Sequence, residues 1–574
     1  MSFICPTRIV TYYFVVSTEK VNERIKHGTF DDKFLWKGPI TGLKPSGDTN
    51  LTALTYEGCL EICENRTDLV STRSTLEMVA TWIFPLAIVF NLPYDSIHTR
   101  KIWRTIKAVL NWTGSPQTAL THTIWNVRQI RHCHRMAKSK QNGLWSDAFY
   151  VLSCLGQFDI TFDDDNLDET FYNALVYGLF RPLSRSRARQ DGRVDKDQQY
   201  TAHLLSSMAI QLRMLRRRGV IPTLASLGTF ITAFVFSIVL AFDEEAGGRT
   251  GSPLTLGLLY CWLPLSVIFT IIDRNPVSAD RSALLMSRWL FNVNAVLTSA
   301  RAAIDANGNR DTDLMAEPEW WSPRTNDDNI KPFHINEFIG QGRRVHYCGL
   351  ADATIRATNG RYKKMGYNLD DYANCARAIR GSLKKRRPGQ WYVTALLAFF
   401  LVLFEVMMAF LIAFCTPTFG LGCWSGSLVL YGILSSLTWV YHLFSKSPGR
   451  KGRFVCHCFN LVSLTWLVTL TGLVLTGGFR TCYCSTVQLS HDYLGYGGYM
   501  MFYTFDFYVK NFRMNGPWVT ASVLGGLVLG AVLVTATAWW MKCQHLWSTE
   551  EKEPTDGLDL TSVDVRADTQ WLDR

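Results

Sequence analysis

The stretch that decides the fold is Trp391 to Cys415, WYVTALLAFFLVLFEVMMAFLIAFC, in which Glu405 is the only charged residue. A helix needs about 20 apolar residues to cross a hydrocarbon core of about 30 Å. The basic block Lys384 to Arg387 precedes this stretch, and basic residues gather at the cytosolic ends of membrane helices. The stretch therefore predicts a membrane-spanning helix that runs from the cytosolic side to the outer side.

The net charge of +11 is concentrated in alternate loops of the chain. Residues 95–218 carry roughly +8, residues 273–390 roughly +6 and residues 446–453 roughly +4, which is the positive-inside pattern. A nucleic-acid-binding protein would instead place its basic residues along one face or stripe. The distribution favours a membrane protein and excludes nucleic acid as a partner.

Further apolar stretches on both sides of the first predict more membrane helices. They are residues 76–92, 221–242, 254–272, 427–443, 454–476 and 519–541. Pro85 interrupts the first of these, and proline is tolerated in a membrane helix where neighbouring groups bond the freed carbonyl. We expect an all-α membrane protein with about seven transmembrane helices, its N-terminus outside and its C-terminus cytosolic.

These spans divide the chain into alternating outer, membrane and cytosolic regions. We expect an outer or lumenal segment at 1–75, a first span at 76–93, a cytosolic loop domain at 94–219 and a hairpin of two spans at 220–272. A second cytosolic loop domain follows at 273–390, then four spans at 391–541 with a Tyr- and Gly-rich outer segment at 478–517, and an acidic cytosolic tail at 542–574. Both loop domains are predicted to be mainly helical, with helices near 100–112, 117–138, 202–218 and 283–304 and a possible strand at 148–153.

Two sequons in the N-terminal segment support an outer location for it. Asn50 and Asn65 begin these sequons, and Cys59 and Cys63 lie between them. Glycans and disulfide bonds both belong to the lumenal or extracellular face. A third sequon, at Asn111, falls in a basic loop, and we expect it to be unmodified because the loop is predicted to be cytosolic.

Four more cysteines fall on the predicted outer face, beside the last four spans. They are Cys415, Cys423, Cys482 and Cys484. An oxidising compartment allows disulfides, so we expect two bonds that tie these loops together, in a pairing that sequence alone does not assign. The alternative is that the four thiols bind a metal, which their spacing without clustered histidines disfavours.

Glu405 is the one acidic residue deep inside the predicted span Trp391 to Cys415. A carboxylate near the centre of a bilayer costs several kcal/mol unless it is neutral or paired, so such residues are candidates for function. Glu405 could bind a cation, relay a proton or anchor a ligand. The structural alternative is a protonated side chain that bonds a neighbouring helix.

An acidic stretch in the first loop matches a metal-binding pattern. Asp164, Asp165 and Asp168 follow the Asp-Asp-x-x-Asp order with which polyprenyl-diphosphate enzymes bridge Mg²⁺ to pyrophosphate. The alternative is a solvated turn that caps the helix beginning near Glu169. The chain contains no second metal motif, nucleophile elbow, P-loop or dinucleotide fingerprint. We expect no metal site and no cofactor, with Mg²⁺ only if the chain is such an enzyme.

Several longer stretches carry a resemblance to a known group of proteins. They are TWIFPLAIVFNLPYDSIHTRK (81–101), GSPQTALTHTIWNVRQI (114–130), DAFYVLSCLGQFDI (147–160) and FIGQGRRVHYCGLA (338–351). These resemble uncharacterised multi-pass integral membrane proteins of filamentous ascomycete fungi, some of which are encoded beside secondary-metabolite genes. The resemblance covers residues 75–540. It implies a fungal plasma-membrane or endomembrane protein, and it brings no site residues with it.

Three functions are compatible with the sequence, which leaves open whether the chain is an enzyme. The first is a non-catalytic sensor, scaffold or accessory factor whose partners are the lipid bilayer and cytosolic proteins that dock on 94–219 and 273–390. The second is a membrane-bound enzyme or accessory protein of secondary metabolism, for example terpenoid biosynthesis, with its site where Asp163 to Asp168 meet the membrane. The third is a transporter centred on Glu405.

Overall fold

A computed structural model describes the helices and strands of the chain with the short connections beside them. The described residues are 31–38, 51–63, 102–138, 143–160, 165–184, 196–215, 220–242, 252–273, 279–307, 333, 335, 338–340, 349–361, 372–384, 387–415, 420–445, 449–476, 478–479, 482–486, 498–503 and 516–543. The predicted span at 76–92 and the sequons at Asn50 and Asn65 lie outside these residues, and so stay predictions.

Four of the described helices are long and apolar enough to cross a membrane. They are α15 (Gly389–Phe414), α16 (Cys423–Phe444), α17 (Arg450–Thr476) and α21 (Pro517–Cys543). The stretch around Glu405 is thus a continuous helix, as its sequence predicts, and the three spans predicted after it are also found. The expectation of a mainly helical chain with helices long and apolar enough to span a membrane is confirmed, whereas the count of seven spans and their orientation stay predictions.

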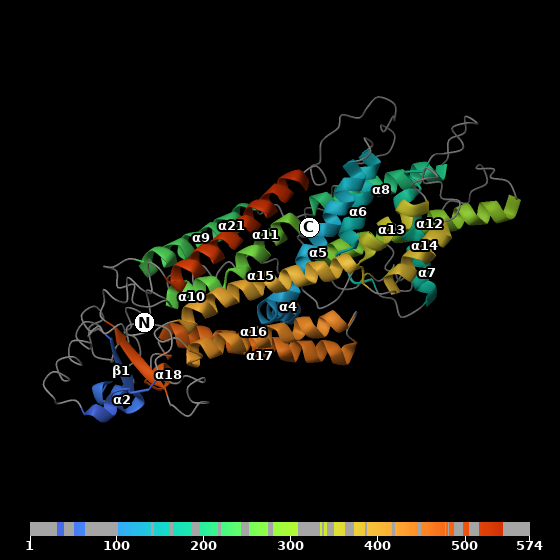
Figure 1. The fold of residues 1–574 in the computed structure, drawn as a ribbon. Coiled ribbons are helices and arrows are strands. Elements are labelled where there is room, and N and C mark those ends of the chain that lie inside the picture. Colours follow the sequence, from blue (N-terminus) through green and yellow to red (C-terminus); the bar gives the residue numbers. More distant parts are fainter. Residues whose placement is uncertain are drawn as a thin grey trace.

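The hairpin predicted at 220–272 consists of three helices. α9 (Val220–Phe242) covers the first predicted span, and a central part, Leu227–Val239, forms its apolar segment. The second predicted span is divided into α10 (Ser252–Leu259) and α11 (Trp262–Asp273). α10 packs against α15, and α11 packs against α21, so the divided span is part of the same bundle. We call α9, α10, α11, α15, α16, α17 and α21 the membrane bundle (Figure 1).

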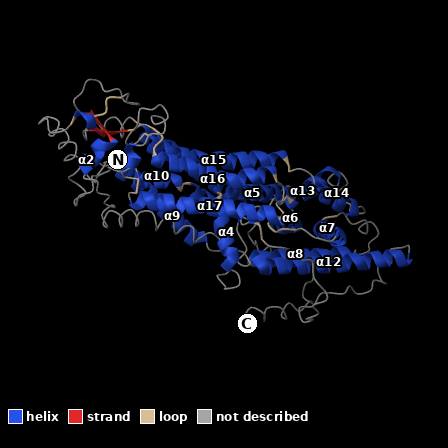
Figure 2. Ribbon diagram, turned by 90° about the horizontal axis from the view of Figure 1, so that it is seen from below, coloured by secondary structure: helices blue, strands red, loops and turns tan. Residues whose placement is uncertain are grey.

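Two helices expected in a cytosolic loop enter this bundle. α4 (Ile102–Gly114) runs across the other helices and packs on α17, and α5 (Pro116–Lys138) then runs beside α15, α11 and α16 (Figures 1 and 2). Both helices form where their sequences predict them. Their packing differs from the expectation of a separate loop domain, because most of the α5 side chains are buried against neighbouring helices.

The remaining helices of the two predicted loop domains form one helical body at the far end of α5. They are α6 (Gly143–Leu155), α7 (Asp165–Phe180), α8 (Lys196–Met214), α12 (Ala279–Asn307), α13 (Leu350–Arg361) and α14 (Tyr372–Lys384). α12 and α14 from the second segment pack on α7 from the first, so the two segments share a core. The possible strand at 148–153 was wrong, since these residues lie in α6. A short apolar run that is buried on all sides shows neither the 3.6-residue period of a helix nor the two-residue period of a strand clearly.

A small cap closes the other end of the bundle. It contains the 3-10 helix η1 (Asp32–Phe34), the helices α2 (Tyr56–Cys63) and α18 (Cys482–Thr486), and the strands β1 (Leu51–Thr55) and β2 (Tyr499–Tyr503). The two strands pair antiparallel, with Leu51 opposite Tyr503. This sheet departs from an all-α fold. It joins the N-terminal segment to the last predicted outer segment, so the two lie at one end of the molecule. Their outer location stays a prediction.

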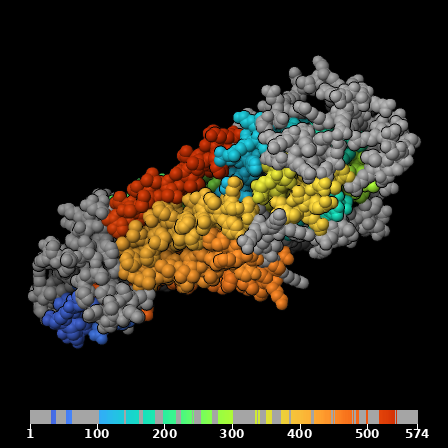
Figure 3. All heavy atoms as spheres, turned by 45° about the vertical axis from the view of Figure 1, so that its right-hand side comes forward, coloured from blue at the N-terminus to red at the C-terminus, as the bar shows by residue number. Residues whose placement is uncertain are grey.

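Many apolar side chains on the four long helices are exposed on the surface of the bundle. Exposed apolar side chains on the four long helices include Val393, Leu397, Phe400, Ile433, Leu461, Val468, Leu527 and Val534. Figure 3 shows α15 and α21 side by side on this surface. Such a wide exposed apolar surface belongs in contact with lipid rather than with water. The finding agrees with a membrane location for the bundle.

Candidate functional site

Glu405 is the centre of the candidate site. Its side chain is fully buried in α15, and within the described part of the chain neither carboxyl oxygen has a hydrogen-bond partner. Gly525 of α21 faces it closely, because a Cβ atom added there would lie 3.3 Å from Glu405 Oε2. The same added atom would lie 2.4 Å from Cδ2 of Leu258 in α10. The carboxyl group therefore sits where α10, α15 and α21 meet.

The break between α10 and α11 lies beside this carboxyl group. Pro264 has no N–H to give to the carbonyl of Tyr260, and in a continuous helix its ring would collide with that carbonyl. The Tyr260 carbonyl accepts instead from the N–H of Leu263, at 2.9 Å, so the chain turns more tightly at Tyr260 and Cys261. Both residues are buried, and Cys261 is close enough to Glu405 for their charges to interact.

Two tyrosines complete this level of the bundle. The Tyr260 hydroxyl shares a hydrogen bond of 2.7 Å with the hydroxyl of Thr471 in α17. Tyr431 of α16 is fully buried, and its hydroxyl has no hydrogen-bond partner among the described residues. At about 1.5 Å per residue, Glu405, Tyr431 and Gly525 each lie about 12–14 Å from the cap end of their own helix. We call Glu405, Tyr260, Tyr431 and Thr471 the carboxyl level.

A second buried polar group lies closer to the helical body. The Asn460 side chain in α17 donates to the Asn111 side-chain oxygen at 2.9 Å and accepts from the Thr438 hydroxyl at 2.6 Å. Close by, the Gln117 amide of α5 donates to the Ser435 hydroxyl at 2.9 Å. We call Asn111, Asn460, Thr438, Gln117 and Ser435 the amide level. Its hydrogen bonds link α4, α5, α16 and α17.

The helix ends nearest the helical body are joined by Arg387, which is buried just before α15. Its guanidinium donates to the carbonyl oxygens of His442 and Ser445 at the end of α16, in the first case at 2.7 Å. It also lies over the Trp391 ring, 4.0 Å from the ring centre. The His442 ring is 4.8 Å from the ring of His122 in α5. We call this end of the bundle, defined by Arg387, the basic end.

α5 was the functional element that sequence reasoning missed. Its polar side chains are buried inside a bundle of apolar helices, and they include Gln117, Thr118, Thr121, His122, Asn126 and Gln129. The polar composition of 117–138 led to its prediction as a loop helix. The sequence nevertheless contains a signal of burial. A solvent-exposed helix carries a charged face, whereas α5 has no charged residue before Arg128.

The acidic candidates do not gather as a metal site in the described part of the chain. Asp168 is paired with Arg380 of α14, which ties α7 to α14 in the helical body. The side chains of Asp163, Asp164 and Asp165 lie outside the described residues. Within the described residues, no group of three His, Cys, Asp or Glu side chains could hold a metal ion.

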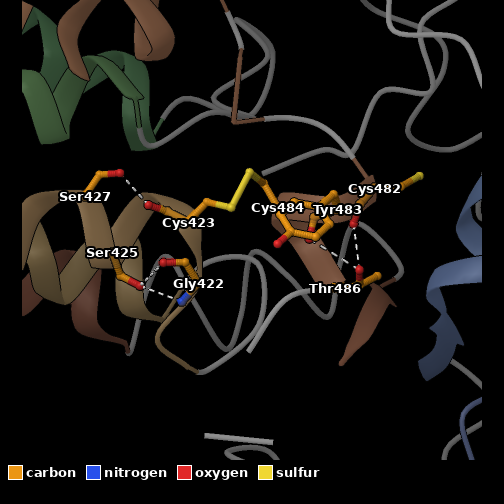
Figure 4. The surroundings of a disulfide bond; sticks show 8 residues. All are labelled: Gly422, Cys423, Ser425, Ser427, Cys482, Tyr483, Cys484 and Thr486. Carbon is orange, nitrogen blue, oxygen red and sulfur yellow. Dashed lines mark hydrogen bonds between the residues drawn. A yellow bond between two sulfur atoms is a disulfide. The ribbon is translucent and has the colours of Figure 1, made fainter. Parts of the chain in front are cut away.

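The cysteines of the described residues form two disulfides, as the sequence predicts, but with a different set of partners. Cys423 pairs with Cys484, and Cys482 pairs with Cys59 of the N-terminal segment. Figure 4 shows the side chains of Cys482 and Cys484 directed to opposite sides of α18. The expectation for Cys415 was wrong: it is a buried free thiol at the end of α15. The side chain of Cys63 lies outside the described residues.

The sequon at Asn111 is enclosed in the bundle. Asn111 is almost fully buried, and its side-chain oxygen accepts the bond from Asn460. Gly114, one turn on, is so close to α17 that an added Cβ atom would lie 2.4 Å from the Asn460 carbonyl oxygen. A glycan has no room at this position, in agreement with the prediction that Asn111 is unmodified.

No protein-family model, no curated protein and no solved structure matches this chain.

Proposed function

We propose that the chain is a proton-coupled membrane transporter in which Glu405 takes up and releases the coupling proton. The observation that carries this proposal is the fully buried carboxyl group with no hydrogen-bond partner among the described residues. A charged carboxylate in such surroundings costs several kcal/mol unless it is neutralised, so its retention in a membrane helix favours a functional role.

The surroundings of Glu405 favour a proton over a metal cation. Ca²⁺ takes six to eight oxygen ligands, and Mg²⁺ keeps a near-ideal octahedral shell. Gly525 faces the carboxyl group with the apolar Leu258 beside it, and neither supplies a side-chain oxygen. A proton needs only the carboxyl group itself.

The divided helix supplies an element that can change shape. Membrane transporters place their ion and substrate sites at discontinuous helices, because the interrupted backbone can move and offers free polar groups. The break at Tyr260 and Cys261 lies beside Glu405, and α10 and α11 pack on α15 and α21. Protonation of Glu405 would then favour a different packing of the divided helix, which is the step that couples proton to solute.

A sensor or scaffold is the second candidate, and the path of α5 favours it. This helix packs on α15 and α11 in the bundle and on α6 and α13 in the helical body. A change in the bundle would therefore reach the helical body, where cytosolic partners are expected to dock. No observation among the described residues favours the enzyme of secondary metabolism, since Asp168 is paired with Arg380.

The test is the protonation of Glu405 in the intact protein. Infrared difference spectra between acidic and alkaline pH, recorded in nanodiscs, should contain a carboxylic acid band that disappears in Glu405→Gln. On a solid-supported membrane, mixtures of amino acids, sugars or organic acids are added under an inward pH gradient. The wild-type chain should give a current with one of them, and Glu405→Gln should not.

Each result bears on the proposal. Glutamine has nearly the size of glutamate, so the variant should fold, and its thermal unfolding serves as the control. A wild-type spectrum without a pH-dependent band from Glu405 would overturn the role of the proton. A current that is equal in the two proteins would overturn transport through Glu405.

A further inference from the structure

A stripe of buried polar side chains runs along α16 from the carboxyl level to the basic end. It consists of Tyr431, Ser435, Thr438 and His442, and each is at most 1% exposed. Residues three or four positions apart lie on the same face of a helix, about one turn from each other. The stripe is therefore a continuous polar line on the buried face of a helix whose other face is apolar.

Side chains of α5 and α17 bond two members of this line. Ser435 accepts from Gln117 of α5, and Thr438 donates to Asn460 of α17. A hydroxyl group donates one hydrogen bond and accepts others at the same time, which is what passing a proton requires. At the basic end, His442 lies beside His122 and Arg387.

The opposite side of Glu405 carries no such line on its own helix. From Val406 to Phe414 every residue of α15 is apolar. On α16, the hydroxyls of Ser425 and Ser427 bond the backbone of the first turn and of the residues just before it. On the cap side, Thr255 of α10 and Ser522 of α21 are also buried, each about one turn from Leu258 or Gly525. Ser522 donates to the Trp518 carbonyl of its own helix. The polar line that continues over several turns is the one on α16, and it leads to the basic end.

We propose that protons reach Glu405 from the basic end, along the α16 stripe and its partners Gln117 and Asn460. The inference rests on the proposed function, because it gives the route to the same carboxyl group. Ser435 and Thr438 are the positioning residues of this route, and His442 is its entrance. Since the basic end is the predicted cytosolic end, the proton would exchange with the cytosol.

The competing explanation is that these groups only hold the helices together. Interhelical hydrogen bonds in membranes are worth about 0.6 kcal/mol on average, and their loss lowers stability. Hydrogen bonds that only hold helices together do not set how fast a carboxyl group exchanges its proton. The rate of protonation of Glu405 therefore separates the two explanations, whereas stability alone does not.

The experiment follows the Glu405 carboxylic acid band after a rapid pH jump, with the full-length protein in nanodiscs. Ser435→Ala and Thr438→Val remove one hydroxyl each. Each substitution should slow the rate at which the band changes by about tenfold, which corresponds to about 1.4 kcal/mol in the barrier. The final intensity of the band should be unchanged. Thr438→Ser restores a hydroxyl and should restore the rate.

Ser427→Ala is the matched control, because this hydroxyl lies on α16 towards the cap and donates to the Cys423 carbonyl of its own helix. Its rate should equal that of the wild type. If Thr438→Val fails to fold, Ser435→Ala carries the test, since Gln117 can keep a bond to Ser436, at 3.5 Å.

The outcomes separate this route from the proposed function. Unchanged rates in folded Ser435→Ala and Thr438→Val overturn the route, while a pH-dependent Glu405 band still supports the role of the proton. An equal slowing in Ser427→Ala also overturns the route. Absence of the band overturns both proposals at once.

Discussion

The carboxyl level and the amide level are two buried polar groups in one bundle, and they are built in opposite ways. At the amide level, Asn460 exchanges hydrogen bonds with both Asn111 and Thr438. At the carboxyl level, Glu405 has no hydrogen-bond partner among the described residues. A satisfied polar group inside a bundle stabilises the packing of its helices, whereas an isolated carboxyl group costs free energy.

Polar side chains that bond each other across helices, as at the amide level, are explained by the packing of the bundle. Four helices meet at the amide level, and each would lose a contact if the network were removed. Glu405 contributes no such bond in the described part of the chain, so its presence is not explained by folding. Matched substitutions at the two levels test this difference.

The largest effect is expected for Asn460→Leu. The new side chain is similar in size, but the Asn111 side-chain oxygen loses the bond from Asn460, and the Thr438 hydroxyl is left with a longer bond of 3.4 Å to the Cys456 carbonyl. Each buried polar group that loses a bonding partner costs about 1–3 kcal/mol, so we expect a loss of about 3 kcal/mol in the free energy of unfolding. Chemical denaturation of the detergent-solubilised protein measures it.

Glu405→Gln is the matched variant at the carboxyl level. It should change the unfolding free energy by less than about 1 kcal/mol, because no hydrogen bond is lost and a costly charge is removed. Similar losses in both variants would contradict the distinction between the two levels.

A smaller effect is expected where a methyl group is added at each level. An added Cβ at Gly114 would lie 2.4 Å from the Asn460 carbonyl oxygen and 2.7 Å from its Cα, so backbone would have to move. We expect Gly114→Ala to cost about 1–3 kcal/mol in unfolding free energy, in the range of overpacked cores. At Gly525 the closest atom, at 2.4 Å, is the end of the Leu258 side chain, which can rotate.

Gly525→Ala should therefore cost less than Gly114→Ala. Gly530→Ala on the same helix is the control, because an added Cβ there meets nothing within 4 Å. Thermal unfolding of the three variants gives the order. A larger loss at Gly525 than at Gly114 would show that the carboxyl level is the more tightly packed of the two.

The smallest effect concerns pH and the far end of α5. Burial lowers the pKa of His132, with nearby arginines acting in the same direction and Asp352 opposing them. As the pH falls through about 6.5, the ordinary pKa of histidine, the unfolded chain therefore binds more protons than the folded chain. The free energy of unfolding falls over the same range. His132→Gln should flatten this dependence, which unfolding at several pH values can measure. An unchanged slope would assign the dependence to other groups.

The spans could be predicted from the sequence because a long apolar stretch has few alternatives. Trp391 to Cys415 satisfies all its backbone groups within one helix, as a bilayer demands, and its composition alone predicts this. The same holds for α16, α17 and α21. The presence of disulfides followed from cysteines on the predicted outer face, but their pairing depended on where the cap folds.

The place of α5 could not be predicted in this way. Its polar residues are compatible with a solvated helix. In the structure, Gln117 bonds Ser435 of α16, and Thr121 bonds a carbonyl of α5 itself, so these groups can be buried. The same limit applies to the break at Tyr260, since Pro264 alone does not say whether a helix bends or divides.

The sequence alone is enough to predict that the chain is mainly helical, with helices long and apolar enough to cross a membrane, and that Glu405 lies inside one of them. Both follow from local composition, because a long apolar stretch crosses the hydrocarbon core of a bilayer as a helix, and a charged side chain is costly there. The tertiary structure decided what surrounds Glu405: the divided helix on one side, and the polar stripe of α16 towards the basic end. These are contacts between residues far apart in the chain, and only the packing of the helices brings them together.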